Sequence, residues 1–131
     1  MHAPLILQAG QAFTSTAGVT YAVTWTAQPV TSDPYHRSYI PAQPWLKVNV
    51  HVTNQGAQVA EAPSVRVAYN GTDAPRSQVA PPSGGYNSPA VLPGQQGDLW
   101  EGYEVPPQGA RIQVELALYG TNGQMTAYWT N

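Results

Sequence analysis

The chain has 131 residues, no cysteine and a net charge of −2, and only 9% of its residues are charged. This length fits a single domain over residues 1–131 with a core of its own, and the lack of cysteine excludes a disulfide framework and a thiolate metal site. The five basic residues form no patch that could neutralise phosphates, and no apolar run is long enough to span a bilayer. We therefore expect no nucleic-acid partner and no membrane insertion.

The first ten residues, MHAPLILQAG, form a candidate N-terminal arm. They lack the positively charged region and the long apolar segment of a signal peptide. Two origins fit this start: a mature exported domain whose signal has been removed, or an unexported protein such as a virion component. In a monomer, the apolar residues 4–7 should pair as an edge strand or cover the core, whereas in an assembly they would cross to a neighbouring chain.

Apolar residues at every second position mark the segments 18–26, 45–54, 64–69 and 111–119. This period predicts antiparallel strands with one face on a core. Residues 124–130 continue the pattern, whereas residues 98–105 are less regular because Glu101 falls on the apolar side with Leu99 and Tyr103. The aromatic residues predicted to lie in the core are Tyr21, Trp25, Tyr69 and Trp129.

Turn residues and prolines separate these segments. Residues 54–56 and the pair Asn70–Gly71 supply side chains that tolerate a positive φ, and residues 120–123 predict a hairpin between the last two strands. Two long proline-rich stretches, residues 29–45 and 80–97, are better suited to crossovers between sheets than to the tight turns of a barrel. We therefore predict an all-β chain that folds as an immunoglobulin-like, antiparallel two-sheet β-sandwich.

Three segments together resemble a known family. They are the strand and turn WLKVNVHVTNQG, the strand and turn VRVAYNGTDAP, and VLPGQQGDLWEGYEVP, in which a Leu-Pro-Gly turn precedes a strand ending in Val-Pro. Over residues 19–130 the chain is similar to bacterial extracellular immunoglobulin-like domains of the telokin-like, mycobacterial immunoprotective-antigen type, which include envelope lipoprotein domains of unassigned function. The resemblance implies an exported sandwich with no catalytic residues to carry over, although the lipobox cysteine of the lipoproteins is absent here.

Catalytic chemistry has little support in the sequence. Ser38, His36 and Asp33 share one short proline-rich segment, whereas a triad needs its base held by a rigid scaffold. Glu101 and Glu104 fall on opposite faces of their predicted strand, so they would not converge on one substrate. We expect a protein that is not an enzyme and needs no cofactor.

Metal binding is a weaker hypothesis. A structural zinc site needs four convergent ligands, and the chain offers only scattered ones. The weak candidates are His2, Asp33, His36 and His51. We therefore expect no metal centre.

Aromatic residues outside the predicted core are the strongest functional signal. Tyr and Trp are enriched in binding surfaces because they give contact area at low entropic cost. The candidate binding residues are Tyr35, His36, Arg37, Tyr39, Trp45, Tyr86 and Trp100. The alternative is that these rings cover the open ends of the sandwich.

Three functions are compatible with these features. The first is a non-enzymatic interaction module, extracellular or in the cell envelope, which binds a protein or surface partner through aromatic loops. The second is a structural virion protein, such as a decoration or fibre domain, which forms a homo-oligomer. The third is a metal-handling envelope protein that uses His2, His36 and His51.

Overall fold

The computed structural model describes residues 5–31, 43–61, 63–77, 79, 90–120 and 123–131. This part of the chain is built from strands and contains no α-helix. Accordingly, no helix that could cross a membrane occurs within these ranges.

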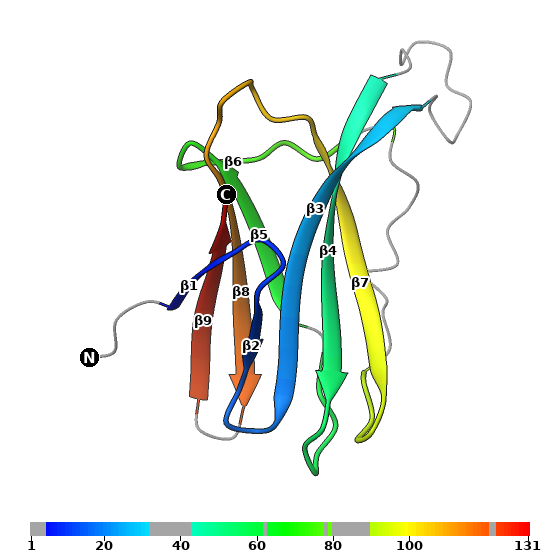
Figure 1. The fold of residues 1–131 in the computed structure, drawn as a ribbon, viewed down its shortest axis with the longest axis vertical. Coiled ribbons are helices and arrows are strands. Elements are labelled where there is room, and N and C mark those ends of the chain that lie inside the picture. The colour runs from blue at the N-terminus through cyan, green and yellow to red at the C-terminus, as the bar shows by residue number, and fades with distance from the viewer. Residues whose placement is uncertain (1–4, 32–42, 62, 78, 80–89, 121–122) are drawn as a thin grey trace.

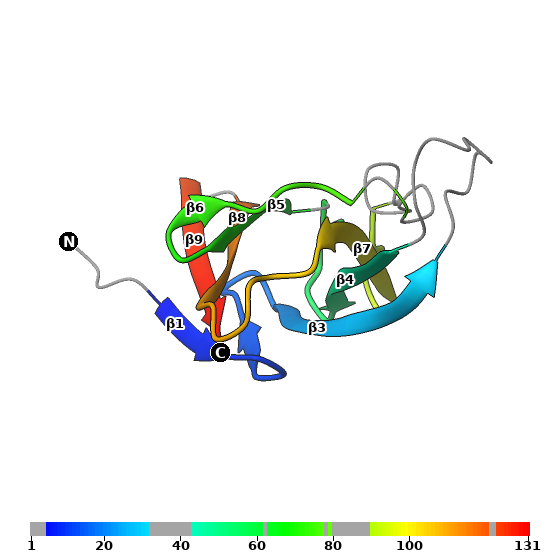
Figure 2. The ribbon, with the colours of Figure 1, turned by 90° about the horizontal axis from the view of Figure 1, so that it is seen from above.

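The strands form two sheets, which lie as two layers in Figures 1 and 2. The five-stranded sheet contains, in spatial order, β1 (Leu5–Gln8), β9 (Gly123–Thr130), β8 (Ile112–Gly120), β5 (Ser64–Tyr69) and β6 (Thr72–Asp73). The four-stranded sheet contains, in spatial order, β2 (Ala12–Thr14), β3 (Val19–Thr31), β4 (Gln43–Asn54) and β7 (Gln96–Glu104). The prediction of an all-β, two-sheet β-sandwich is confirmed.

The core lies between the two sheets and follows the predicted alternation. In β4, Val48, Val50 and Val52 are buried while the residues between them are half-buried on the opposite face. Of the four aromatic residues predicted for the core, Tyr21, Tyr69 and Trp129 are buried, and Trp25 is half-buried and packs against the core from β3. The period of two in the sequence therefore identified the inner face correctly.

One connection differs from its prediction. Residues 29–45 were expected to cross between sheets, but β3 and β4 are antiparallel neighbours, paired from Val19 with Asn54 to Thr31 with Gln43. Both strands also extend into the proline-rich stretch, with a register shift between Gln28 and Thr31. The segment joins two adjacent strands of one sheet, because strand pairing depends on partners that proline content does not reveal.

The apolar arm pairs as an edge strand, one of the two arrangements expected for a monomer. Residues Leu5–Gln8 form β1, which pairs with β9 in parallel, whereas the other strand pairs of the described chain are antiparallel. Leu5 and Leu7 pack against the core, and Ile6 points outward and is exposed. After a turn the chain enters the other sheet as β2, so the N-terminal region contributes to both layers.

Two buried aromatic side chains donate hydrogen bonds to the backbone outside their own sheet, one to the turn before β2 and one to β7. The indole Nε1 of Trp129 on β9 donates to the backbone oxygen of Gln11 at 2.8 Å. The phenol of Tyr69 on β5 donates to the backbone oxygen of Glu104 on β7 at 2.6 Å. Burial, and to a lesser extent the negative charge of Glu104, raise the pKa of Tyr69 to about 12. Both polar groups are thus satisfied within the sandwich.

The turn after β4 is held by a buried amide. Asn54 is fully buried, and its Nδ2 donates to the backbone oxygens of Gln58 and Val91 at 2.7 and 2.8 Å. Its Oδ1 accepts from the backbone N–H of Gly56 at 2.9 Å. Gly56 is required for space rather than for a positive φ, because a Cβ there would lie 2.0 Å from the backbone oxygen of Ala17.

The predicted hairpins are present. Asn70 and Gly71 connect β5 to β6 with φ values of 52° and 84°, as expected for a two-residue turn that matches strand twist. Strands β8 and β9 pair up to Gly120 opposite Gly123.

We predict that Gly56→Ala lowers the free energy of unfolding by about 2 kcal/mol or more, because the new methyl group would force the backbone near Ala17 to move. Gly97→Ala is the matched control, since its Cβ would meet only a side-chain methyl of Val91 at 3.5 Å. Urea denaturation measures both. Equal unfolding midpoints for the two variants would contradict the close approach.

We also predict that alkaline pH weakens the fold through Tyr69. Since the folded state raises its pKa from 10.0 to about 12, its stabilising effect is complete below pH 10 and is lost as pH rises toward 12. Tyr69→Phe should unfold more easily at pH 8, because the hydrogen bond is lost, yet lose less stability between pH 10 and 12. Urea denaturation at several pH values in this range measures how the free energy of unfolding of each protein changes with pH. The same pH dependence for the wild type and Tyr69→Phe would contradict the prediction.

Candidate functional site

The outer face of the four-stranded sheet carries the described part of the predicted binding residues. In the register of β4 and β7, Trp45 lies opposite Glu104, Asn49 opposite Trp100, and His51 opposite Asp98. Because the alternate residues of both strands are in the core, these side chains lie on the side away from it. We name the following set the indole face: Trp45, Lys47, Asn49, His51, Gln96, Asp98 and Trp100.

Two indoles meet on this face. The ring centroids of Trp45 and Trp100 lie 5.7 Å apart with a tilt of 32°. Trp45 lies opposite Glu104, which is four residues from Trp100 along β7. The position between Trp100 and Glu104 on the same face is Gly102, which lies opposite Lys47. Gly102 has no side chain, so the two rings can approach above the strand at this point. The sequence predicted both tryptophans as binding residues but not their contact.

The indole of Trp100 is held in place and remains partly accessible. The ammonium of Lys47 lies 5.1 Å from its ring centroid, within the range of a cation–π interaction worth about 0.5–1 kcal/mol at an exposed site. Trp100 is half-buried, whereas Trp45 is only 6% exposed although it lies outside the core cluster. Trp100 therefore offers the more accessible ring.

A hydrogen-bonded group lies beside the indoles. Asp98 Oδ1 accepts from Asn49 Nδ2 at 3.0 Å and from His51 Nδ1 at 2.9 Å. An ionised carboxylate can only accept, so Nδ1 of His51 carries a proton. The other ring nitrogen, Nε2, lies 3.2 Å from Gln96 Oε1. The hydrogen bond from Asn49, followed by that from His51, holds the pKa of Asp98 below its ordinary value.

Strand β3 extends this face with small polar residues. Thr20, Thr24 and Thr26 lie opposite Thr53, Asn49 and Lys47, and Ala22 lies opposite His51. Thr24 and Thr26 are exposed. The face is therefore a three-stranded surface with hydroxyl groups on one side and the indoles on the other.

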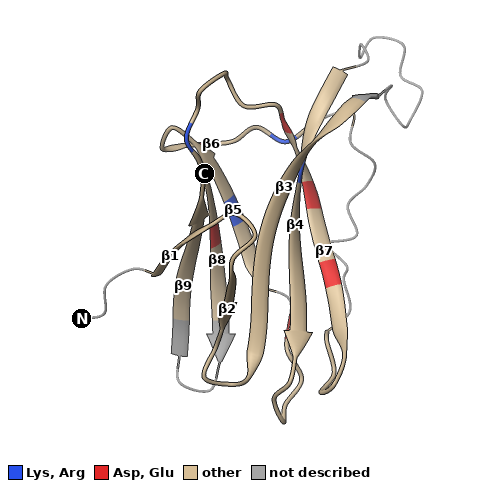
Figure 3. Cartoon of the chain, in the orientation of Figure 1, with Lys and Arg blue, Asp and Glu red and all other residues tan. Residues whose placement is uncertain are grey.

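Charge is sparse over the molecule. Figure 3 shows the charged residues of the described chain scattered along the strands and connections, without a concentrated positive region among them. On the outer side of the described parts of β3, β4 and β7 the fixed charges are Lys47, Asp98 and Glu104. The candidate site is close to neutral.

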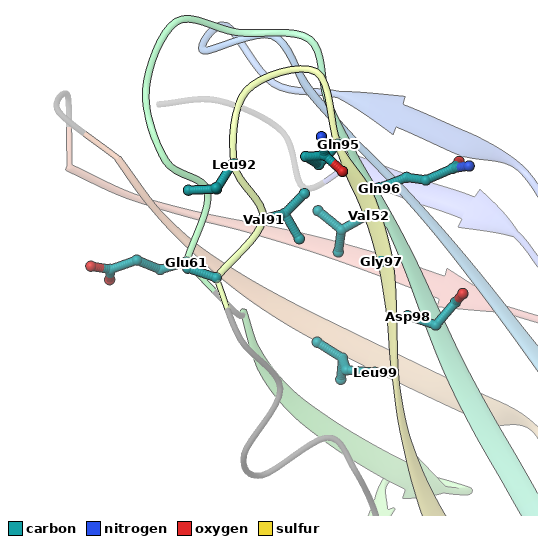
Figure 4. A pocket seen from close by; sticks show the side chains of 10 residues that line it. Val52, Glu61, Val91, Leu92, Gln95, Gln96, Gly97, Asp98 and Leu99 are labelled. Atoms are coloured by element: carbon teal, nitrogen blue, oxygen red, sulfur yellow. The ribbon is translucent and has the colours of Figure 1, made fainter.

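A pocket of about 320 Å³ lies at the free edge of β7, and its lining includes Gln96 and Asp98 of the indole face. Figure 4 shows Val52, Val91 and Leu92 lining it with apolar side chains, while the carboxylate of Glu61 points away. The polar ends of Gln96 and Asp98 also point away from Val91 and Leu92, so the described part of the lining can hold an apolar group but has few polar groups to orient it. The pocket is therefore a less specific candidate than the indole face.

Glu101 explains the irregular pattern of its segment. It is buried on the inner side of β7, where it accepts a hydrogen bond from the phenol of Tyr103 and pairs with Arg76 at 3.3 Å. Burial, followed by the hydrogen bond to Glu101, raises the pKa of Tyr103. Glu104 is exposed on the opposite side, as predicted, so the two carboxylates do not converge.

The remaining predicted site residues fall outside the described ranges. These are the binding candidates Tyr35, His36, Arg37, Tyr39 and Tyr86 and the metal candidates His2 and Asp33, together with His36. His51 is described, and its bonds are to Asp98 and Gln96. Among the described residues there is no group of three or more His, Cys, Asp or Glu that could hold a metal ion.

Four members of the indole face were not singled out from the sequence. Lys47 and Asn49 were visible on the polar side of their strand, but polar strand faces are ordinary. Gln96 and Asp98 became relevant only through the pairing of β7 with β4, which places them beside His51. The signal that could have found them is the alternation of β7 counted outward from Trp100.

Comparisons with known proteins identify no relative. No protein family, curated protein or solved structure matches the chain. The fold and the side chains on its surface therefore define the class to which the protein belongs, a two-sheet β-sandwich with an aromatic and polar outer face. The resemblance to bacterial extracellular immunoglobulin-like domains stays a prediction.

We predict that Asn49→Ala raises the pKa of Asp98 toward its ordinary value of 3.8, because the largest cause of the lowered value is removed. The ionised carboxylate of Asp98 stabilises the folded state above pH 3.8, and this stabilisation is lost as pH falls through the lowered pKa of Asp98 in the folded protein. In Asn49→Ala the pKa is higher, so the carboxylate should become protonated at a higher pH. Carboxyl titration by NMR measures the change.

Arg66→Ala is the control for this titration. It removes the ion pair that lowers the pKa of Asp73 at the far edge of the other sheet, and should leave the titration of Asp98 unchanged. An Asp98 titration in Asn49→Ala that matches the wild type would show that the hydrogen bond to Asn49 does not form in solution.

Proposed function

We propose that this chain is a non-enzymatic interaction module, extracellular or in the cell envelope, which binds a protein or surface partner through the indole face. The observation that carries the proposal is Trp100. Its half-buried indole lies on the outer side of a strand, close to both Lys47 and Trp45, and on the same face as the hydrogen-bonded Asp98. Tryptophan dominates the energetics of many interfaces, and side chains already fixed in place lose little entropy on binding.

The arrangement of the N-terminal residues supports a module that folds alone. The structural virion interpretation relies on an arm that packs on a neighbouring chain, whereas β1 pairs with β9 of its own chain. Leu5 and Leu7 contribute to the core in this arrangement. A second copy is therefore not needed to cover these apolar side chains.

We predict that Trp100→Ala weakens binding to fractionated cell-envelope material by about tenfold or more, the loss expected when a stacking side chain worth at least about 1.4 kcal/mol is removed. Biolayer interferometry on untreated and protease-treated fractions measures the change. Thermal unfolding confirms that the variant is folded, and Trp100→Tyr, which retains a ring, should recover part of the affinity.

Tyr128→Ala is the matched control, since Tyr128 is a half-buried aromatic residue on the outer side of the five-stranded sheet. It should bind like the wild type. If Trp100→Ala also binds like the wild type, the indole face is not the binding surface.

A further inference from the structure

We propose that the indole face binds a neutral glycan, with the C–H face of a hexopyranose ring stacked on Trp100 and its hydroxyl groups bonded to Asp98 and its neighbours. This inference rests on the proposed function and adds the chemical class of the ligand. It is carried by five properties of the described face: its shape, its oriented indole, its unused hydrogen-bonding groups, its charge and the polar residues beside Trp100.

The shape of the face suits an extended ligand. Residues on one side of a strand repeat about every 7 Å and neighbouring strands lie about 4.8 Å apart, so three strands present a shallow grid of side chains. On β3 this grid contains Ala22, Thr24 and Thr26, which are too small to interrupt it, and Gln28 opposite Trp45. A chain of sugar rings can lie along such a surface, whereas a compact small molecule would find no enclosure.

The aromatic part of the face is suited to a sugar ring. The face of an aromatic ring is electron-rich and attracts partly positive C–H groups, such as those on one side of a hexopyranose. Lys47 and Trp45 already fix the orientation of Trp100, so little side-chain freedom is lost when a ligand stacks on it. The Lys47 ammonium also brings a hydrogen-bond donor to the same place.

The polar part of the face has capacity left for hydroxyl groups. Both hydrogen bonds to Asp98 use Oδ1, and no described residue bonds to its Oδ2. The Asp98 side chain is 53% exposed, so this oxygen can accept a hydrogen bond from a ligand hydroxyl. Asn49 retains its amide oxygen, and Thr24 and Thr26 offer exposed hydroxyls on the adjacent strand.

The charge of the face favours a neutral ligand. Its one lysine is opposed by the carboxylates of Asp98 and Glu104, so an anionic polymer would meet no excess of positive charge. The Lys47 ammonium is directed to the indole of Trp100, and Oδ1 of Asp98 is directed to Asn49 and His51. A cationic ligand would have to compete with Lys47 for the ring of Trp100, and with Asn49 and His51 for Oδ1 of Asp98.

A protein partner is less well matched to this face. Protein interfaces usually have an apolar centre surrounded by polar residues. None of the exposed large apolar residues of the described chain is a member of the face; they are Ile6, Val59, Leu92, Val105 and Met125, of which Leu92 lines the neighbouring pocket with Asp98. Among the described residues of the face, the neighbours of Trp100 other than Trp45 are the polar side chains of Lys47, Asn49 and Asp98, which suit hydroxyl-rich ligands.

The test is native affinity electrophoresis of the whole chain in gels that contain one soluble polysaccharide each. The neutral set is a β-glucan, an α-glucan, a mannan, a galactan and a xylan, and the anionic set is hyaluronate and polygalacturonate. Calorimetry then measures the affinity of any polysaccharide that retards the protein. We expect retardation by at least one neutral polysaccharide and by neither anionic one.

Variants locate the binding. Trp100→Ala should weaken the affinity by about tenfold or more, and Asp98→Ala by a smaller factor, while Tyr128→Ala should bind like the wild type. Asp98→Asn keeps an acceptor oxygen and should recover part of the loss, which separates ligand contact from a change in folding. A glycoprotein tested before and after enzymatic removal of its glycans shows whether the same chemistry is recognised on a protein.

Several results would overturn the inference: no retardation by any neutral polysaccharide, retardation by the anionic ones alone, or equal binding by Trp100→Ala. The proposed function is tested separately with cell-envelope fractions. If the Trp100→Ala variant loses binding to a protease-sensitive fraction while no polysaccharide binds the wild type, the module binds a protein and only the glycan inference falls. If this substitution changes neither measurement, both fall.

Discussion

The pairing register of β3, β4 and β7 is the constraint on which both the core and the candidate site depend. Each strand has a side-chain period of two, so a shift of one residue would exchange the inner and outer faces. With the observed register, Val48, Val50 and Leu99 are buried between the sheets while Asn49, Trp100 and Asp98 come together outside. The burial of the valines therefore also specifies which polar residues meet on the outer face.

The ends of this register are held by side chains that bond to the backbone. Asn54 at the end of β4 bonds to three backbone groups, and Gly56 allows the backbone of Ala17 to approach closely. At the other end of the sandwich, Tyr69 joins β5 to the backbone of Glu104. Because buried polar groups that lack partners are costly, these contacts disfavour alternative registers as well as stabilising the native one.

Alternation in the sequence was sufficient to predict the six principal strands, the inner face and the anomaly at Glu101, because these follow from the local period of side chains. Strand neighbours could not be derived in the same way. The stretch 29–45 was assigned to a crossover, yet it joins adjacent strands, and Trp45 and Trp100 are 55 positions apart (100 − 45) before pairing brings them together. Gly102, which makes room for their contact, is an ordinary glycine until its position opposite Lys47 is known.

The tryptophans show how the same side chain can serve two purposes in one sandwich. Trp129 is fully buried and its N–H bonds to Gln11, so its whole surface contributes to the fold. Trp100 is placed on the opposite side of the other sheet, where burial in the core cannot account for it. With 9% charged residues the protein has little long-range attraction to offer, and binding must come from contact area and hydrogen bonds. An oriented indole beside an exposed carboxylate oxygen supplies both, which is why a neutral, hydroxyl-rich ligand fits this surface better than a charged one.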